Sequence, residues 1–505
     1  MRGFATRFAA AVGALAIGAV LVVSLAVALR LAQVRFFRSP AKPERAAEKS
    51  AYLERVAQAA SGRDASALPS FVVVFFDDLG YGDLGSYGNR LIATPRLDAL
   101  ADQGLRMTQF YAAAPVCTPS RAALLTGRFP FRAGAGPHVY FPNDAPLGLA
   151  LGFFGFPNEV RSDEIFLPEA LRAAGYATGM VGKWHLGDAD GHRPNDLGFD
   201  SYYGVLWSHD MQPLDVYRDR DVVVRDETEQ SWLHAFRDEE DAREFRGIDP
   251  RTFTDDYTRE AIRFLERSQA DGPRPFFLYL AHSAPHVPHF ASRAQAGRSR
   301  GGVYGDVVED LDRSTGELVD ALDRLGLSER TLVLVTSDNG ADYGGSPGAL
   351  RGRKGEVLEG GMRVPMIARW PGRVASGTSD AIAMNLDVFP TLLGLARVPL
   401  PDDRVVDGRD LAPVLLANAP SPHEFLYYLG GAASGSHVAA VRDARFKYLL
   451  ESGDRGRSRP HLTSLALDAE AHDLRARHPE EAARLAQAAA RLQAELDANP
   501  RGFRE

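Results

Sequence analysis

The 505-residue chain contains a single cysteine, Cys117. One thiol cannot form a disulfide within the chain, and without a cysteine cluster the sequence offers no thiolate zinc site. The chain also lacks an excess of basic residues. Its formal net charge is −8 and no basic stripe runs along it, which argues against a nucleic-acid-binding protein. No internal repeat is present, so a repeat architecture is excluded. The composition is that of an ordinary globular protein, 45% hydrophobic and 25% charged, with room for one large domain and a smaller one.

One long apolar run stands apart from this composition, because residues 8–29 carry no charged side chain. The run is long enough to span a bilayer as a helix, and Arg2 and Arg7 before it favour a cytoplasmic N-terminus, although arginines follow it too. Since the run exceeds the core of a usual signal peptide, we interpret residues 1–36 as an N-terminal membrane anchor. Cleavage near residues 26–28, which resemble a signal-peptidase site, is the alternative.

Both interpretations place the rest of the chain outside the cytoplasm. An anchored protein would face the periplasm if the host is bacterial, and a cleaved one would be secreted. Residues 37–70, which are rich in Ala, Arg, Glu and Ser, are expected to form a helical or loose stalk between the membrane and the folded domain.

Short continuous apolar runs alternate with helical patterns through the middle of the chain. Four runs are typical of strands buried on both faces of a parallel sheet: residues 71–76, 177–182, 275–281 and 331–337. The helical patterns cover residues 96–104, 167–175, 257–267 and 307–326. This alternation predicts an α/β fold with a large, mostly parallel sheet covered by helices on both faces.

Polar side chains follow each of the four predicted strands. They are Asp77 and Asp78, then Lys183 and His185, then His282 and His286, and finally Asp338 and Asn339. Because ligands of open α/β sheets bind beyond the carboxyl ends of the strands, we expect these groups to meet at one edge. Each alone has an ordinary explanation as a helix cap or loop residue, but four such coincidences are hard to dismiss.

Asp77, Asp78, Asp338 and Asn339 offer three carboxylates and one amide oxygen. This set suits a hard divalent cation such as Ca²⁺ or Mg²⁺. The same segments also have good turn chemistry. However, carboxylates clustered without a cation would repel one another, so a metal is the simpler account if the two strands are neighbours.

A basic set accompanies the acidic one: Arg121, Lys183, His185, His286 and Lys354, with His282 as a further candidate. Together with a cation, these side chains suit a small oxyanion such as sulfate or phosphate. Lys354 lies in a segment rich in Gly and Arg, and it could equally be a solvated loop residue.

The segment after Cys117 predicts a short helix. Thr118 suits a helix cap, Pro119 the first helical position and Gly127 the stop. Cys117 would then lie at the helix N-terminus, where unpaired N–H groups favour a thiolate or an anionic substrate. A small buried hydrophobic residue is the alternative, which these residues leave open.

The run Cys117-Thr118-Pro119-Ser120-Arg121, continued by AALLTG, resembles the signature of the formylglycine-dependent (type I) sulfatase family of the alkaline phosphatase superfamily. Further segments resemble other family blocks in the same order, nearest to the arylsulfatase A type. They are residues 71–88, 175–187, 208–213, 276–289, 331–340, 350–372 and 440–450. The resemblance extends from residue 71 to about residue 490. It implies an alkaline phosphatase-like catalytic domain over 71–395 and, over 396–505, a subdomain with a small antiparallel sheet and a terminal helix.

The resemblance also implies a chemistry for Cys117. A formylglycine-generating enzyme would oxidise it to Cα-formylglycine, an aldehyde that is hydrated beside one Ca²⁺ ion, with Mg²⁺ as the less favoured ion. Asp77, Asp78, Asp338, Asn339 and the modified Cys117 would hold this ion. By the same resemblance, one hydroxyl would attack the sulfur of a sulfate ester and the alcohol would leave. His185 would then take a proton from the second hydroxyl, and sulfate would be expelled.

The remaining family motifs give roles to the basic set. Arg121 and Lys183 would hold the formylglycine and a sulfate oxygen, while Lys354 and His286 would contact sulfate and help the leaving oxygen. His286 is preferred over His282 because the family histidine is followed by one residue and then proline, as in His286-Val287-Pro288. The expected reaction is hydrolysis of a sulfuric ester. A phosphonate monoester or phosphodiester hydrolase, and a non-catalytic protein with the same fold, are the alternatives.

One stretch departs from the family pattern. Residues 143–160 are apolar and rich in Gly where a shorter polar loop is expected. The stretch is too short to span a bilayer. It could touch a membrane, cover the active site or pack as an ordinary loop.

Overall fold

The computed structural model describes residues 20, 22–29, 42–64, 67–143, 145–156, 158–228, 245–270, 272, 274–432, 435–450, 460–465 and 470–504. Most of the predicted anchor, residues 1–36, lies outside this set. Within the set, no helix combines the length and the apolar character needed to cross a membrane.

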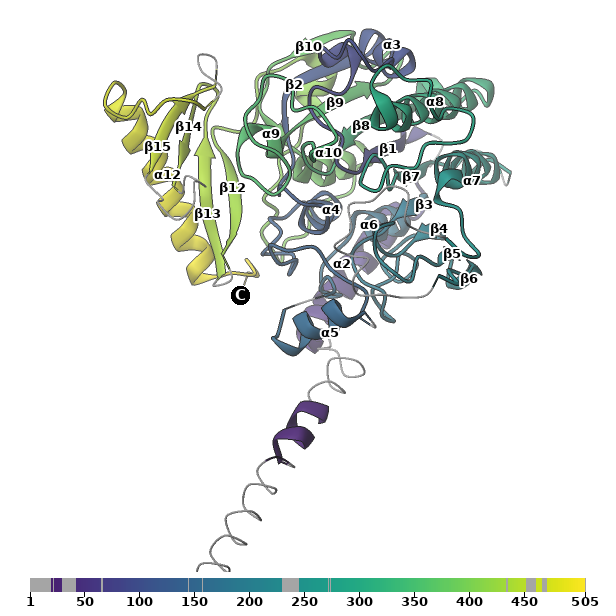
Figure 1. Ribbon diagram of the computed structural model, residues 1–505, viewed down its shortest axis with the longest axis horizontal. Helices are drawn as coiled ribbons and strands as arrows, with labels where there is room; N and C mark the ends of the chain where they lie inside the picture. Colours follow the sequence, from purple (N-terminus) through teal and green to yellow (C-terminus); the bar gives the residue numbers. More distant parts are fainter. Residues whose placement is uncertain are drawn as a thin grey trace, which may run out of the picture.

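A large mixed sheet forms the centre of the molecule (Figure 1). Its strand order is β10-β2-β9-β8-β1-β7-β3-β4-β5-β6, and β11 also pairs with β2. The strands are β1 (Ser70–Phe76), β2 (Leu105–Tyr111), β3 (Ala177–Lys183), β4 (Ser201–Val205), β5 (Val216–Arg218), β6 (Asp221–Val224), β7 (Phe276–Ala281), β8 (Thr331–Ser337), β9 (Arg363–Arg369), β10 (Gly377–Ser379) and β11 (Ala383–Met384). Pairing is antiparallel at β9 with both of its neighbours and from β4 through β6, and parallel in the other pairs.

The four strands predicted from the sequence are confirmed, and they are consecutive neighbours in the order β8-β1-β7-β3. All three of their pairings are parallel, so their carboxyl ends lie at one edge. Each of the four is buried along its whole length. This burial explains why these strands are continuous apolar runs rather than alternating patterns.

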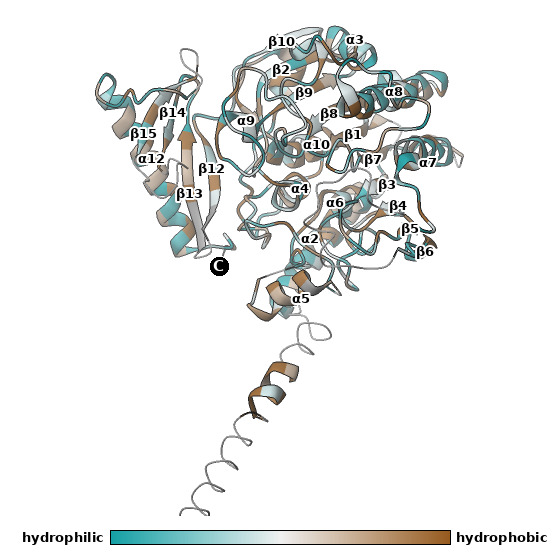
Figure 2. Ribbon diagram, viewed as in Figure 1, coloured by the Kyte–Doolittle hydropathy of each residue, from teal (hydrophilic) through white to brown (hydrophobic). Residues whose placement is uncertain are grey.

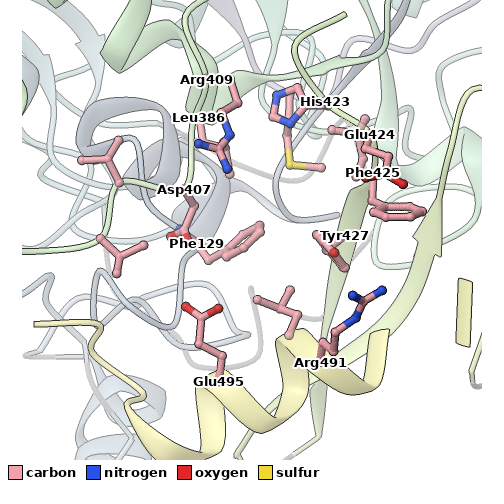
Figure 3. Close-up of a pocket in the computed structure, with 15 residues that line it drawn as sticks. Phe129, Leu386, Asp407, Arg409, His423, Glu424, Phe425, Tyr427, Arg491 and Glu495 are labelled. Atoms are coloured by element: carbon pink, nitrogen blue, oxygen red, sulfur yellow. The ribbon is translucent and has the colours of Figure 1, made fainter. Parts of the chain in front are cut away.

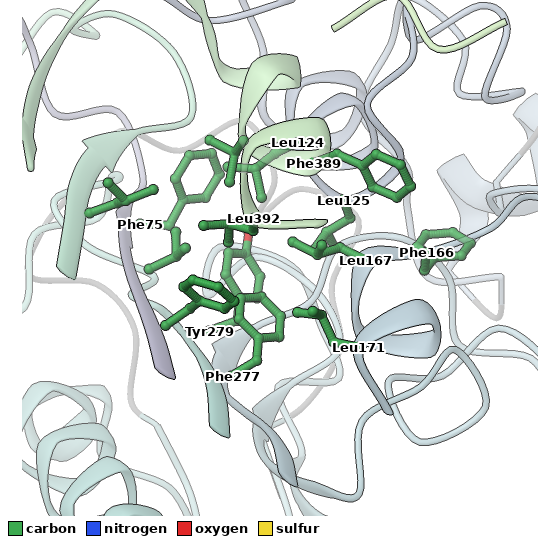
Figure 4. Packing of buried hydrophobic residues seen from close by; sticks show 14 of the residues in the cluster. Phe75, Leu124, Leu125, Phe166, Leu167, Leu171, Phe277, Tyr279, Phe389 and Leu392 are labelled. Carbon is green, nitrogen blue, oxygen red and sulfur yellow. The ribbon is translucent and has the colours of Figure 1, made fainter. Parts of the chain in front are cut away.

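Helices cover both faces of the sheet, and β1 contributes alternate side chains to the two layers. Phe71, Val73 and Phe75 pack toward α2 (Pro43–Ala60), α4 (Cys117–Thr126), α6 (Leu167–Ala173) and α10 (Val388–Leu395). Figure 4 shows Phe75 in one cluster with residues of α4, α6 and α10. Val72, Val74 and Phe76 pack toward α3 (Pro95–Gln103), α7 (Phe253–Ser268) and α8 (Gly302–Arg324). The predicted doubly covered α/β fold is therefore confirmed.

Helix α2 lies within the range interpreted as a stalk, but it is packed onto the domain. Its Tyr52 and Val56 are buried in the core beside α6. The Tyr52 hydroxyl donates to the carbonyl of Pro399, and Lys49 pairs with Glu169 at 2.7 Å. The helical interpretation of this segment is thus correct, while a free stalk is wrong for the part that α2 occupies.

A second sheet forms the C-terminal subdomain, with the antiparallel order β12-β13-β14-β15. Its strands are Leu426–Ala432, Gly435–Arg442, Phe446–Leu449 and His461–Ser464, and α12 (Pro479–Ala498) packs on it. Residues 440–450 form a hairpin, because the side chain of Asp443 accepts hydrogen bonds from the backbone N–H groups of Arg445 and Phe446 and so closes a turn between β13 and β14.

Shorter elements complete the described part of the chain: the α-helices α5 (Pro146–Phe153), α9 (Glu359–Met362) and α11 (Ala412–Ala417), and 3₁₀ turns at Gly85–Tyr87, Pro250–Thr252, Ser328–Arg330 and Asn385–Asp387. Residues of α11 and the segment before it, such as Val398 and Leu415, pack in the same core as α2 and α6. The large domain therefore continues beyond residue 395.

Candidate active site

Acidic side chains meet where β1 and β8 end. Phe76 pairs with Ser337, so the residues that follow the two strands lie at the same level. The backbone N–H of Asp78 donates to Asp338 Oδ1 at 3.1 Å, and Asn339 Nδ2 donates to Asp78 Oδ1 at 2.7 Å. Asp78 adopts a left-handed backbone with φ 70°, an unfavourable conformation that these contacts hold in place.

Helix α4 begins at Cys117 and ends at Thr126, and Gly127, which follows with φ 68°, provides the predicted stop. The predicted cap is wrong. The Thr118 hydroxyl donates to the carbonyl of His185 and accepts from the N–H of Tyr140, both at 3.1 Å, so it ties three segments together instead. Cys117 is fully buried at the helix N-terminus, with its Sγ 3.3 Å from Asp77 Oδ1.

Arg121 and Lys183 fix the acidic residues from the side of α4 and β3. Lys183 Nζ lies 2.5 Å from Asp77 Oδ2. Arg121 donates twice to Asp338 Oδ2, from Nε at 3.0 Å and from Nη2 at 2.8 Å, and its Nη1 donates to the carbonyl of Lys183 at 3.0 Å. All four side chains are completely buried, so this is a dry network of charges rather than a set of surface ion pairs.

Lys354 and His286 complete the cluster from two loops. Lys354 Nζ lies 2.7 Å from Asp78 Oδ2, and His286 Nε2 lies 3.7 Å from the same oxygen. The backbone of the Lys354 loop is held at both sides, since Lys354 N donates to the carbonyl of Ala341 and Gly355 N donates to that of Pro115. The solvated-loop alternative for Lys354 is therefore wrong.

His185 follows β3 and is buried, with φ 61°. Its Nε2 lies 3.0 Å from the carbonyl oxygen of Tyr140, while Nδ1 is buried without a hydrogen-bond partner. Because a carbonyl can only accept, the contact assigns the ring proton to Nε2 and leaves a lone pair on Nδ1. The pKa of His185 is held well below its ordinary value, by burial first and then by the charges of Lys183 and Arg121.

His282 does not join the cluster. Its ring packs against Phe76 and Tyr257, and its Nε2 lies 3.3 Å from the Ser314 hydroxyl. The preference for His286 over His282 thus agrees with the geometry. Sequence reasoning missed two neighbours of His286 in the quoted segment 208–213. His209 Nε2 lies 2.9 Å from the carbonyl of His286, and Asp210 Oδ1 lies 4.0 Å from its Nδ1.

The charges of the cluster shift the pKa values of Asp77 and Asp338 in opposite directions. Burial alone would raise the pKa of Asp77, but the charges of Lys183, His286 and Arg121 outweigh it and hold that pKa well below its usual range. Burial and the charge of Asp77 raise the pKa of Asp338 to about 7, against the opposing charge of Arg121. Burial and the same charge of Asp77 raise the pKa of the Cys117 thiol well above its ordinary value. The unmodified thiol is therefore neutral and unsuited to act as a thiolate.

The donor set fits a hard cation. One ligand atom from each of Asp77, Asp78, Cys117 and His286 lies within 4.8 Å of all the others. Asn339 Oδ1 is buried without a hydrogen-bond partner, which is costly for an amide oxygen unless a cation or a water binds it. Unlike the amide oxygen of Asn339, both carboxylate oxygens of Asp338 accept hydrogen bonds: Oδ2 accepts from Arg121, and Oδ1 accepts from the N–H of Asp78.

A buried ion cluster of the C-terminal subdomain supports the Lys354 loop. We call Lys447, Glu359 and Glu470 the Lys447 clamp. Lys447 Nζ lies 3.1 Å from Glu359 Oε1 and 2.9 Å from Glu470 Oε1, and it donates to the carbonyl of Val357 at 2.8 Å. Glu470 Oε2 in turn accepts the N–H of Glu359 at 2.8 Å. The clamp joins β14 to the segment that carries Lys354, and the sequence held no pattern that predicted it.

A separate cavity of about 430 Å³ lies between the large domain and the C-terminal subdomain (Figure 3). Phe129, Asp407 and Arg409 line it on one side, and Tyr427 and Arg491 on the other. Its lining includes none of the candidate active-site residues, so this cavity is separate from the candidate active site.

Comparison with known proteins agrees with this geometry. The sequence matches the family described as Sulfatase over residues 69–398 and the family described as N-sulphoglucosamine sulphohydrolase, C-terminal, over residues 353–451. It is 38% identical to arylsulfatase A of Homo sapiens over 417 residues, which cover 77% of this chain and 76% of the human protein.

Two solved structures share the fold. PsFucS1 sulfatase from Pseudoalteromonas sp. superposes with a TM-score of 0.70 at 25% identity, covering 91% of this chain and 96% of that one. Phosphonate monoester hydrolase of Agrobacterium radiobacter superposes with a TM-score of 0.59 at 20% identity, covering 85% and 96% of the two chains. At that lower identity the likeness concerns the fold alone.

Proposed function

Because the chain belongs to the sulfatase family, we propose that it hydrolyses a sulfate monoester through a nucleophile derived from Cys117, releasing sulfate and an alcohol. The observation that carries this proposal is the burial of Cys117 at the N-terminus of α4, with its Sγ 3.3 Å from Asp77 and its thiol held neutral. A thiol in this state is a poor nucleophile. Its place among two lysines, an arginine and acidic groups suits an oxygen nucleophile made by oxidation to formylglycine.

Formylglycine at position 117 supplies a hydrated aldehyde, whose two hydroxyls permit attack on sulfur and the later release of sulfate. We propose that Arg121 and Lys183 orient this group, since Arg121 is held by Asp338 and Asp77 and Lys183 is held by Asp77. Lys354 and His286, which both lie beside Asp78 Oδ2, are suited to hold the sulfate oxygens and to stabilise charge on the leaving oxygen.

His185 is proposed as the base that takes a proton when sulfate leaves. Its Nδ1 is the atom that accepts, because Nε2 is committed to the carbonyl of Tyr140. The lowered pKa keeps the ring neutral and therefore able to accept. A histidine so placed also exchanges protons without moving, because the Thr118 hydroxyl holds its backbone.

Asp77, Asp78, Asp338 and Asn339, with residue 117, are proposed to hold one Ca²⁺ ion, which would supply positive charge beside the nucleophile and the sulfate oxygens. The unpartnered amide oxygen of Asn339 and the closely spaced carboxylates support this proposal. Ca²⁺ is favoured over Mg²⁺ because it accepts a larger and less regular set of oxygen ligands.

Maturation and location follow from the same proposal. A formylglycine-generating enzyme would be the maturation partner, recognising the run from Cys117 to Arg121. We further propose that the protein works outside the cytoplasm, anchored by residues 8–29 or released by cleavage after them.

The test uses the full chain, expressed with a formylglycine-generating enzyme and supplied with Ca²⁺. Hydrolysis of an aryl sulfate is compared with that of the matching aryl phosphodiester, with Cys117→Ala as the control and mass spectrometry of residue 117 alongside. Faster sulfate turnover that disappears in the variant is the expected result. Faster phosphodiester turnover would move the protein to a different hydrolase class, and equal rates in variant and parent would refute the role of Cys117.

A further inference from the structure

The segment 145–156 is apolar on every side and yet lies at the surface. It comprises α5 and the turn after it, and no residue in it carries a charged or hydrogen-bonding side chain. Phe154 is 75% exposed, Leu147 41% and Phe156 36%. Figure 2 shows the brown and pale colours of α5 at the lower end of the molecule, where it projects from the body. Scattered exposed apolar residues are normal on soluble proteins, but such a concentration marks a contact surface.

The segment is a fixed part of the structure. Asn158 Nδ2 donates to the carbonyl of Gly148 at 3.0 Å, which ties α5 to the chain that returns to the body. Gly148 also packs directly on the preceding segment, because a Cβ added there would stand 2.1 Å from the carbonyl oxygen of Pro142. A helix held by such close backbone contact presents its apolar side chains in a preformed way.

We propose that this segment, 145–156, docks on a lipid bilayer and lies in its interfacial region. The chain itself supplies the reason to choose a bilayer, because residues 8–29 form an apolar run long enough to span one. Residues 30–42 separate that run from α2 and reach at most about 45 Å when fully extended. Figure 1 shows α5 at the end of the molecule nearest to the helical residues 22–29.

Contacts of α2 with the segment after α5 strengthen this choice. Lys49 of α2 donates to the carbonyl of Ser162 at 2.9 Å, so the helix that begins after the apolar run is joined to the chain that leaves α5. A run inserted in a bilayer therefore keeps α5 within reach of the same bilayer. The composition of α5, with large apolar side chains and no charge, suits the boundary between lipid headgroups and acyl chains.

The segment is also joined to the candidate active site by packed residues. The Phe156 ring packs edge-on against His138, with ring centroids 5.4 Å apart. Tyr140 follows His138 by two residues, and its carbonyl oxygen contacts His185 Nε2. The docked segment and the base of the proposed reaction are thus linked by a short, continuous stretch of packed chain.

The experiment places a fluorescent reporter on the segment in the full chain. Phe154→Trp is reconstituted in phosphatidylcholine vesicles whose lipids carry bromine either near the headgroup or near the end of the acyl chain. Val303→Trp is the matched control, because Val303 is also exposed, at 47%, but lies on α8 far from α5. We expect quenching of the Phe154→Trp emission, stronger with bromine near the headgroup, and none for the control.

A second variant separates lipid contact from other ways of covering the segment. Leu147→Ser combined with Phe156→Ser, in the Phe154→Trp background, should lose most of the quenching, because two exposed apolar side chains of the segment become polar. Emission that is blue-shifted but not quenched by brominated lipid would mean that the segment packs on a second copy of the chain or on the body, and would overturn the proposal. Quenching equal to that of the control would overturn it as well. None of these readouts depends on sulfate ester hydrolysis.

Discussion

The Lys447→Met substitution tests how the C-terminal subdomain supports the active site. The Lys447 side chain is fully buried between Glu359 and Glu470, and methionine would fill its volume without its charge. Burial alone would raise the pKa of Glu359, but the charges of Lys447 and Arg442 outweigh burial and lower it to about 2. Removing one partner of a buried ion cluster leaves uncompensated charge, which costs about 3–5 kcal/mol. We expect a loss of this size in the free energy of unfolding at pH 7.

The stability difference between parent and variant should depend on pH, and the pKa shifts of the two glutamates give the direction of that dependence. In the parent, the lowered pKa of Glu359 contributes stability that is present above the unfolded value near 4.5 and is lost only as the pH falls toward 2. In the variant, Glu359 keeps the charges of Arg442 and Arg363, whereas Glu470, whose pKa burial already raises in the parent, loses the opposing charge of Lys447. The pKa of Glu470 therefore rises further, folding takes up a proton there, and the variant gains stability relative to the parent as the pH falls from 7 to 5. The deficit should therefore shrink at pH 5.

The measurement is urea unfolding of parent and variant at both pH values, with kcat for an aryl sulfate measured alongside. Because the clamp holds the Val357 carbonyl and the N–H of Glu359, kcat should fall through looser placement of Lys354. Lys447→Arg, which keeps the charge, is the matched control and should recover part of the stability. A deficit below about 1 kcal/mol, the range of an exposed ion pair, or one that is equal at pH 5 and pH 7, would refute the reasoning.

Three further predictions concern the site itself. Cys117→Ser should release about one equivalent of alcohol and no free sulfate, because serine has no second hydroxyl with which to expel the sulfate from the enzyme. Mass spectrometry should find one sulfate on the peptide that contains residue 117, and continued turnover would contradict the proposed chemistry. Gly182→Ala should lower the free energy of unfolding by about 2 kcal/mol or more and abolish activity, since Gly182 has φ 108° and a Cβ would stand 1.9 Å from the carbonyl oxygen of Ala281. Gly175→Ala is the control in thermal unfolding and should destabilise the protein less, because no atom lies within 4 Å of a Cβ at that position. Removal of divalent cations by a chelator should abolish aryl sulfate hydrolysis and lower the unfolding temperature, Ca²⁺ should restore both better than Mg²⁺, and unchanged activity after complete removal would exclude the cation site.

Much of the fold could be predicted because the strands of this protein carry a simple signal. A strand buried on both faces is apolar throughout, so β1, β3, β7 and β8 could be recognised one by one, together with the polar residues that follow them. The hairpin at 440–450 was harder, because its turn depends on the Asp443 side chain rather than on Gly or Pro. Pairing of strands distant in sequence leaves no comparable local pattern.

The sequence alone determined the residue types of the site and their positions just after four strands. The run that begins at Cys117 could also be recognised from the sequence, because its motif consists of consecutive residues. Only the tertiary structure decided that Thr118 holds His185 rather than capping a helix, that Asp338 turns to Arg121, and that Lys447 reaches the Lys354 loop. The physical reason is that these contacts join residues far apart in the chain, and which donor meets which acceptor is settled only when packing removes both from water.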